Sequence, residues 1–525
     1  MSLASFLYNL HYDIEKESPT EWEVDWEDAP LTYKLYRDLP TVPLCHNIPL
    51  RLEGQEIMTK PELLKIGHYL WNVYGLTQIC QSTLASGSDE EVGLMQSNRR
   101  FIPSGGALYP NELYVYLKCE DVTAGVYHYD VARHHLVLLR EGNFDSFLSN
   151  ALGNRCDVSN CFGAIFISTM FWKNFFKYHN FSYRLQGLDA GVLIGQILEV
   201  AKRFGFSTGV YFQFLDRALN HLLGLNEQEE SIYGVVPLSI EASNLFSNTN
   251  TVDSINSATD LCKELPSIEH HYFIKSKKIL GFPKLIQVNE ASMIESTKKV
   301  FQHIEEKKNI QKNSKQINLP KVDRPSYDLL LLNRKRFSPD MDFISKKVSK
   351  VDLATLLHEA AKSFSYLNDL EQSNSNSRSR PSIYMCLNNV EDTPNGAYYY
   401  DDLNHSLREI QLGDFRHQLQ NGLSGTNVNL FQVPICLHVV GDQNHFKSLL
   451  GYRGYRIQHM EAGMMVQRLL LSSTALGMGG HPLLGFDARL CDEIYKLSEE
   501  QRTSLIQIPI GYYRNRPSIQ GGLHS

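Results

Sequence analysis

The chain has 525 residues, of which 42% are hydrophobic and 21% charged, and its formal net charge is −7 at pH 7. This length exceeds that of one ordinary domain, so we expect more than one. The acidic balance argues against a general nucleic-acid binder, which would present a basic stripe.

Features of the chain favour a cytoplasmic protein. Residues 1–17 lack a basic segment followed by a long apolar core, so we expect no secretory signal. The apolar runs at 190–201 and 463–480 are too short or too interrupted to span a bilayer, so no membrane contact is expected. The nine cysteines form no CxxC pair and no zinc pattern, so we expect reduced, buried thiols and no metal.

Hydrophobic patterning predicts the same order of elements in two parts of the chain. The first part contains a helix, a strand, a strand pair, a β-rich run, a long apolar helix and a closing strand, at 61–73, 112–118, 125–139, 161–169, 184–204 and 233–238. The second part contains their counterparts at 351–363, 382–387, 396–411, 430–440, 456–477 and 507–512. Strands and helices intermix without regular βαβ alternation, which indicates an α+β fold. The two long helices are apolar over most of their circumference, so we expect them to be buried against each other.

The sequence also repeats itself. YRLQGLDAG at 183–191 reappears as YRIQHMEAG 272 residues later, and GVYHYD at 125–130 reappears as GAYYYD 271 residues later. We therefore predict two diverged copies of one domain fused in tandem. The predicted parts are an N-terminal strap or peptide-docking segment, a first domain, a linker with an extension, and a second domain, at 1–60, 61–240, 241–324 and 325–525.

The stretch RRFIPSGGALYPNELYVYL, from Arg99 to Leu117, introduces a predicted strand with glycine and positive charge. Glycine lets main-chain N–H groups approach a ligand without a Cβ clash. Ser104 offers a hydroxyl, and Arg100 offers a planar fork for a carbonyl or phosphate oxygen. The alternative is a glycine-rich turn flanked by surface arginines.

Three motifs, RxxPSGGALYP, GVYHYD and KYxxxxYRxxxxDAG, resemble the SagB/ThcOx family. These are FMN-dependent azoline dehydrogenases with a nitroreductase-like fold, which mature ribosomally made thiazole and oxazole peptides. The resemblance covers roughly residues 30–240 and 325–516. It implies FMN at a dimer interface, which two tandem copies would build as an intramolecular pseudo-dimer. It also implies a heterocyclised precursor peptide and a cyclodehydratase complex as partners; further homo-oligomerisation stays open.

The resemblance implies one composite cofactor site. The first copy would contribute Arg100, Pro103, Ser104, Gly105 and Gly106. The second copy would contribute the phosphate-binding arginine motif, two closely approaching glycines and two C-terminal arginines, namely Arg334, Arg336, Ser338, Gly479, Gly480, Arg514 and Arg516. The repeat aligns PSGG with residues 374–377 of the second copy, where the glycines are lost, so we expect a second site to be degenerate. The alternative for Arg334 and Arg336 is a solvated basic turn before a helix.

The family's catalytic Lys-Tyr pair maps onto Lys177 and Tyr178, whereas Lys447 of the second copy is followed by serine. Lys177 would take a proton from the azoline ring, because burial lowers the pKa of a lysine. Tyr178 would relay that proton or hold the ring. Without the resemblance, these residues read as a loop lysine and a packing tyrosine.

Two other functions stay open at this point. The first is a flavin oxidoreductase of the same fold acting on a nitro compound, a quinone or another peptide intermediate. The second is a non-catalytic scaffold that holds a precursor peptide through the N-terminal segment or the 372–380 loop. The chain has no P-loop and no Rossmann pattern, and neither of its adjacent histidine pairs suits a metal.

Overall fold

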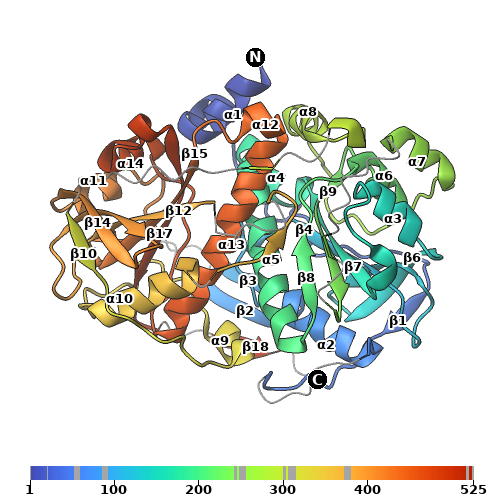
Figure 1. Cartoon of the computed structure of the whole chain (residues 1–525), viewed down its shortest axis with the longest axis horizontal. Coiled ribbons are helices and arrows are strands. Elements are labelled where there is room, and N and C mark those ends of the chain that lie inside the picture. The colour runs from blue at the N-terminus through green and yellow to red at the C-terminus, as the bar shows by residue number, and fades with distance from the viewer. Residues whose placement is uncertain are drawn as a thin grey trace.

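The computed structural model describes residues 2–19, 22–52, 60–84, 93–241, 245–246, 256–299, 303–304, 315–362, 364–371, 380–515 and 519–522. Two long helices, α5 (Ser182–Phe204) and α13 (Arg453–Ala475), lie side by side at its centre. A sheet from each half of the chain stands on either side of them (Figure 1). The predicted α+β fold with two related halves is confirmed.

The two central helices touch backbone to backbone. A Cβ at Gly191 would overlap the main chain at Met460, and a Cβ at Gly463 would overlap the main-chain oxygen of Leu188. These glycines end the two copies of the repeated motif, so the repeat encodes the contact between the halves. Tyr183 and Tyr455, from the start of the motif, stack with ring centroids 5.7 Å apart. The predicted burial of both helices against each other is confirmed.

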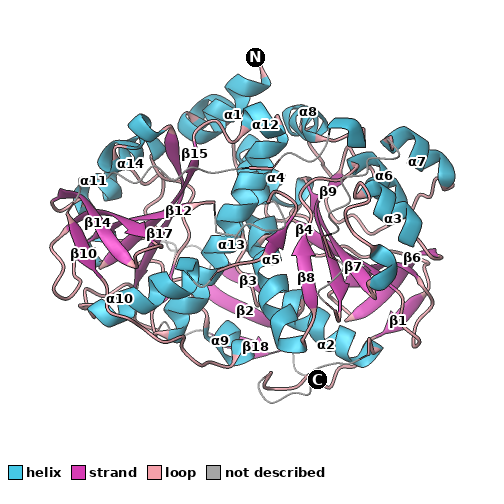
Figure 2. Cartoon of the chain, viewed as in Figure 1, coloured by secondary structure: helices cyan, strands magenta, loops and turns pink. Residues whose placement is uncertain are grey.

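The first sheet has the order β1 (Thr41–Pro43), β6 (His135–Glu141), β5 (Gly125–Asp130), β4 (Asn111–Leu117), β7 (Gly163–Met170), β9 (Glu230–Ser239), β8 (Ser207–Val210) and β11 (Leu367–Asn368). Its strands pair antiparallel, except that β11, from the second half of the chain, pairs parallel with β8. Strands β4 and β9 are buried along their full length because helices cover both faces (Figure 2).

The second sheet repeats this plan with the order β10 (Gln316–Asn318), β14 (Ser406–Leu412), β13 (Gly396–Asp401), β12 (Ser382–Leu387), β15 (Ile435–Asp442), β17 (Arg502–Gly511) and β16 (Gly479–Gly480). A third, small sheet pairs a strand near the C-terminus with two strands of the first half, in the order β18 (Ile519–Gly522), β2 (Leu76–Leu84) and β3 (Gly93–Arg100). The sequence analysis did not predict this sheet. Its strand β3 leads directly into the Pro-Ser-Gly-Gly turn.

The remaining helices are α1 (Leu3–Tyr12), α2 (Leu63–Tyr74), α3 (Asp145–Ala151), α4 (Trp172–Tyr178), α6 (Asp216–Leu223), α7 (Ala258–Glu264), α8 (Pro283–Ser292), α9 (Leu329–Lys335), α10 (Lys350–Leu357), α11 (Arg416–Asn421), α12 (Lys447–Leu450) and α14 (Ala488–Tyr495). One apolar core, which includes α5 and α13, is shared by both halves. Each half has its own smaller core under its outer helices. No helix among the described residues is long and apolar enough to cross a membrane.

The N-terminal segment joins the two halves. His11 of α1 lies 2.7 Å from the Thr503 hydroxyl of the second half, and Asp13 pairs with Arg489 at 3.0 Å. A few residues later, the main-chain oxygen of Glu17 accepts a 3.0 Å hydrogen bond from Asn180 of the first half. Residues 10–18 therefore bridge the junction between the halves.

A composite cavity between the two halves

A cavity of about 210 Å³ lies where the two halves meet. The first half contributes the Pro-Ser-Gly-Gly turn and one face of α5, and the second half contributes residues from four separate segments. The lining residues are Pro103, Ser104, Gly105, Gly106, Leu185, Leu188, Asp189, Val192, Ser338, Val466, His481, Pro482, Leu484 and Ile506. The structure thus brings five of the predicted cofactor-binding residues to one cavity: Pro103, Ser104, Gly105, Gly106 and Ser338.

The carboxylate of Asp189 anchors the Pro-Ser-Gly-Gly turn to α5. It accepts a 2.5 Å hydrogen bond from the Ser104 hydroxyl and a 3.2 Å bond from the Gly105 N–H. The Ser104 oxygen in turn accepts from the Tyr109 N–H at 2.9 Å. These bonds hold the turn in one conformation against the cavity.

Burial raises the pKa of Asp189 to about 7, and the hydrogen bonds from Ser104 and Gly105 oppose that rise only in part. Among the described residues Asp189 has no ion-pair partner, so no positive charge restores the usual acidity. The carboxyl group therefore changes protonation state near neutral pH. Sequence reasoning did not select Asp189 as a site residue, although its place in the repeated motif was visible.

Lys177 and Tyr178 lie at the end of α4, against the same turn. Gly106 has φ +65°, and a Cβ built there would stand 2.6 Å from the Tyr178 hydroxyl and 3.0 Å from Lys177 Nζ. Glycine is therefore required both for the backbone conformation and for the approach of these two side chains. The predicted pair and the predicted turn meet at one point.

The surroundings of this pair shift both of its pKa values. Burial lowers the pKa of Lys177, so its amine loses a proton more readily than an exposed lysine. Burial, followed by the nearby Asp189 charge, raises the pKa of Tyr178 to about 12, so its hydroxyl keeps its proton. Lys177 Nζ also lies 5.1 Å from the ring centre of Trp26, in the N-terminal segment.

Two arginines form a positively charged corner beside Ser338. Arg336 is buried and donates to the Ser338 hydroxyl at 3.2 Å, while its Nε has no hydrogen-bond partner. Arg99 donates to the main-chain oxygen of Arg336 at 3.1 Å. Burial, followed by the charge of Arg99, lowers the pKa of Arg336 to about 10. Within the described residues neither arginine has an acidic partner, so this corner suits an anion such as a phosphate.

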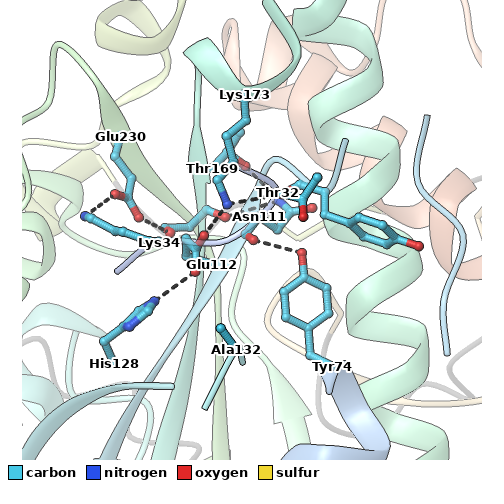
Figure 3. Close-up of polar contacts among 12 residues, drawn as sticks. Thr32, Lys34, Tyr74, Asn111, Glu112, His128, Ala132, Thr169, Lys173 and Glu230 are labelled. Atoms are coloured by element: carbon cyan, nitrogen blue, oxygen red, sulfur yellow. Dashed lines mark hydrogen bonds and ion pairs between the residues drawn. The ribbon is translucent and has the colours of Figure 1, made fainter. Parts of the chain in front are cut away.

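Arg100 lies away from the cavity, inside the first half. Its guanidinium stacks over Tyr74 at 3.8 Å from the ring centre and donates to the main-chain oxygen of Thr32 at 2.6 Å. Figure 3 shows the buried polar network near Tyr74, in which Glu112 contacts Lys173 and His128. This network supports strand β4, which follows the turn.

Gly479, Gly480, Arg334 and Arg514 do not line the cavity either. Gly479 and Gly480 form strand β16, and a Cβ at Gly479 would overlap Pro339, so this glycine serves close packing. Arg334 is half-buried at the end of α9, and Arg514 is exposed. Arg516 lies outside the described residues, as do residues 374–377 of the second copy.

The place related to Asp189 by the repeat is filled with side chains. Its counterpart Glu461 pairs with Arg380 at 2.5 Å and accepts a 2.8 Å hydrogen bond from Tyr366. Strand β11 follows Tyr366 and pairs with β8, so this segment of the second half packs against the first. In the second copy, the surroundings of Glu461 are therefore held by an ion pair and by the pairing of β11 with β8.

Two related α+β halves thus pack around one composite cavity as a pseudo-dimer within one chain. Residues 78–238 and 333–512 each match the nitroreductase family, and the chain belongs to that family. Proteins of this family are flavin-dependent oxidoreductases. Within the described residues, no group of three or more metal-ligating side chains is placed to hold a metal ion.

Individual relatives support this assignment. A putative nitroreductase of Anabaena variabilis has the same fold, with a TM-score of 0.75, 22% identity and coverage of 98% of this chain and 100% of that chain. A putative nitroreductase of Methanocaldococcus jannaschii is 28% identical over 130 residues, which are 25% of this chain and 63% of the relative. The trifolitoxin-processing protein TfxB of Rhizobium leguminosarum bv. trifolii is 32% identical over 142 residues, which are 25% of this chain and 37% of the relative. The chain therefore matches less than two thirds of either curated relative.

Proposed function

We propose that the protein is an FMN-dependent dehydrogenase that oxidises thiazoline or oxazoline rings of a ribosomally made peptide to thiazoles or oxazoles. One observation carries the proposal: Lys177 and Tyr178 reach Gly106 at the composite cavity, so an amine and a hydroxyl lie beside the turn that we propose to contact the flavin. A generic flavin reductase needs no such pair, because it removes no ring proton.

The residues at the cavity fit FMN. Gly105 and Gly106 leave room for close approach, and the unpartnered Nε of Arg336 offers a donor to the phosphate, with Arg99 and Ser338 beside it. Bound FMN supplies the acceptor for the hydride that leaves the azoline ring.

Side chains of the protein remove the ring proton and orient the ring. Lys177, with its lowered pKa, takes the proton from the ring carbon next to the one that loses hydride. Tyr178 keeps its proton and donates a hydrogen bond that orients the ring. Asp189 holds the turn so that the pair and the cofactor keep their relative positions.

The similarity to TfxB supports a peptide substrate, since that relative is a trifolitoxin-processing protein. We therefore propose a heterocyclised precursor peptide as substrate and a cyclodehydratase complex as partner, because a cyclodehydratase forms the azoline ring that this reaction consumes.

The test begins with the visible absorption spectrum of the purified protein and the flavin released per chain. The protein is then incubated with a thiazoline-containing peptide, and the mass of the product is measured by mass spectrometry. Loss of about 2 Da per ring is expected, because oxidation removes one proton and one hydride. A yellow protein that leaves the peptide mass unchanged would point to another substrate, and a protein that binds no flavin would favour the scaffold.

A further inference from the structure

A groove of about 560 Å³ runs from the surface to the catalytic pair. Residues 10–16 of the N-terminal segment form one wall, and residues 484–489 with Ser424 form the other. Lys177, Tyr178 and Arg184 lie along it, and Leu484 lines both this groove and the composite cavity. The groove therefore meets the cavity at the place where we propose the reaction to occur.

The related position on the other side of the molecule is sealed by buried ion pairs. Arg456, the counterpart of Arg184, pairs with Asp216 at 3.1 Å. Arg453 pairs with the same carboxylate at 2.7 Å and donates to the main-chain oxygen of Ser292 at 3.0 Å. All three ion-paired side chains are at most 2% exposed, so this cluster is buried within the protein.

The same ion pairs are not made on the groove side. Asp487 is the counterpart of Asp216, but its carboxylate caps α14 by accepting from the Leu490 N–H at 3.1 Å. Phe181 stands where Arg453 stands in the other copy. Arg184 is 1% exposed, donates to the Leu505 main-chain oxygen at 2.7 Å and leaves its Nε without a partner among the described residues.

A buried guanidinium with a free N–H is costly unless something else satisfies it. On the sealed side, Arg456 donates to Asn289 at 3.3 Å and to Asp216 of the opposite half at 3.1 Å, although its Nε is also without a partner. On the groove side, Arg184 has the single main-chain partner Leu505 and no acidic partner among the described residues, so it has donors to offer a molecule that enters the groove.

We propose that this groove binds an extended segment of the substrate peptide, with Arg184 donating to a main-chain carbonyl oxygen of that segment. The inference rests on the proposed function, since it names the subsite that carries the peptide past Lys177. The charged side chains of the walls are Asp13, Glu15, Lys16 and Arg489, and Asp13 already pairs with Arg489 and Lys16. Their charges balance, which suits an uncharged peptide main chain better than a uniformly charged ligand.

The test measures binding separately from turnover. A fluorescein-labelled ten-residue peptide carrying one thiazoline ring is titrated with the flavin-loaded protein, and its dissociation constant is read from fluorescence anisotropy. Two variants address the groove: Arg184→Gln removes the free donor, and Ser424→Trp fills the groove from an exposed position. Arg133→Gln is the matched control, because Arg133 is an exposed arginine that lines neither cavity nor groove.

We expect Arg184→Gln to weaken peptide binding by about tenfold or more, the usual effect of losing a hydrogen bond to a charged group. We expect a loss of about tenfold or more for Ser424→Trp as well, because the indole ring occupies space that the peptide needs. The flavin content and melting temperature of Ser424→Trp should match those of the wild type. For Arg133→Gln, the peptide dissociation constant, the flavin content and the melting temperature should all match the wild type. If Arg184→Gln does not fold, Ser424→Trp decides the matter alone.

Unchanged binding in Ser424→Trp, or no binding by the wild type, would overturn the groove assignment. Failure of the proposed function looks different: the wild type would bind the peptide but leave its mass unchanged.

Discussion

Asp189 accepts a 2.5 Å hydrogen bond from the Ser104 hydroxyl, which ties the central helix α5 to the turn at the cavity. In the other copy, Glu461 takes the place of Asp189 and pairs instead with Arg380. The same position of the repeat thus anchors the Pro-Ser-Gly-Gly turn in the first copy and forms an ion pair in the second.

We therefore expect close to one flavin per chain. Glu461, which takes the place of Asp189, is engaged by Arg380 and Tyr366, so this carboxylate does not anchor a second cofactor turn as Asp189 does. Quantifying released flavin against protein by absorbance after saturation with FMN checks this expectation. Two flavins per chain would contradict it.

Asp189→Asn should change how stability depends on pH. The folded-state pKa of about 7 lies above the ordinary 3.8, so the native protein holds this proton more tightly than the unfolded chain does. Wild-type stability therefore declines as pH rises from about 4 to 7 and then levels off, by on the order of 2–4 kcal/mol from this group. The variant lacks this decline, so its melting temperature relative to the wild type should rise over that range. A constant difference between pH 4.5 and 7.5 would show that Asp189 keeps its ordinary pKa.

Arg336→Met should weaken FMN binding by about 10- to 100-fold, because a charge-assisted hydrogen bond to the phosphate is lost. Riboflavin, which has no phosphate, should bind the variant and the wild type equally. Arg133→Met is the control, since Arg133 is exposed and lies outside the cavity. Fluorescence quenching of each flavin gives the dissociation constants. An equal loss of affinity for FMN and riboflavin would show that the phosphate does not bind beside Arg336.

Lys177→Ala should lower kcat for azoline oxidation by about 100-fold or more, the usual contribution of a positioned base. Its flavin content should stay at the wild-type level. The control is Lys447→Ala, which removes an exposed lysine two residues before the position that corresponds to Lys177 in the second copy. Mass spectrometry of timed reactions follows the product. A wild-type rate in Lys177→Ala would rule out this lysine as the base.

Gly106→Ala should reduce kcat by about tenfold or more, because the new methyl group meets the Tyr178 hydroxyl and Lys177 Nζ and displaces the pair. Gly451→Ala separates this effect from backbone strain. Gly451 also has positive φ, at +59°, but a Cβ there has nothing within 4 Å. Both variants should lose some stability, and only Gly106→Ala should lose activity; the comparison uses thermal melting together with steady-state rates.

Much of the site followed from local sequence. The Pro-Ser-Gly-Gly turn, the Lys-Tyr pair and the tandem repeat were all visible as short motifs, and the turn and the pair meet in the structure. Short motifs of this kind are readable because each residue's role depends on its own backbone conformation or on a neighbour within one turn.

Arg99 and Arg100 show what short motifs cannot predict, namely which of two neighbouring side chains faces the other half of the molecule. Both arginines precede the same turn, and the sequence analysis selected Arg100. In the structure Arg100 stacks on Tyr74 inside the first half, while Arg99 reaches Arg336 of the second half. Successive residues of a strand point to opposite faces, and only the placement of the partner sheet decides which face meets the cavity.

The repeated motifs by themselves determined that the chain contains two related domains and that only one copy has the Pro-Ser-Gly-Gly turn and the Lys-Tyr pair. The tertiary structure alone decided the role of Asp189, the pairing of Arg99 with Arg336 and the open groove beside Arg184. These depend on contacts between residues up to several hundred positions apart. The packing of α5 against α13 creates those contacts, and no local pattern in the sequence encodes which groups it leaves buried without a partner.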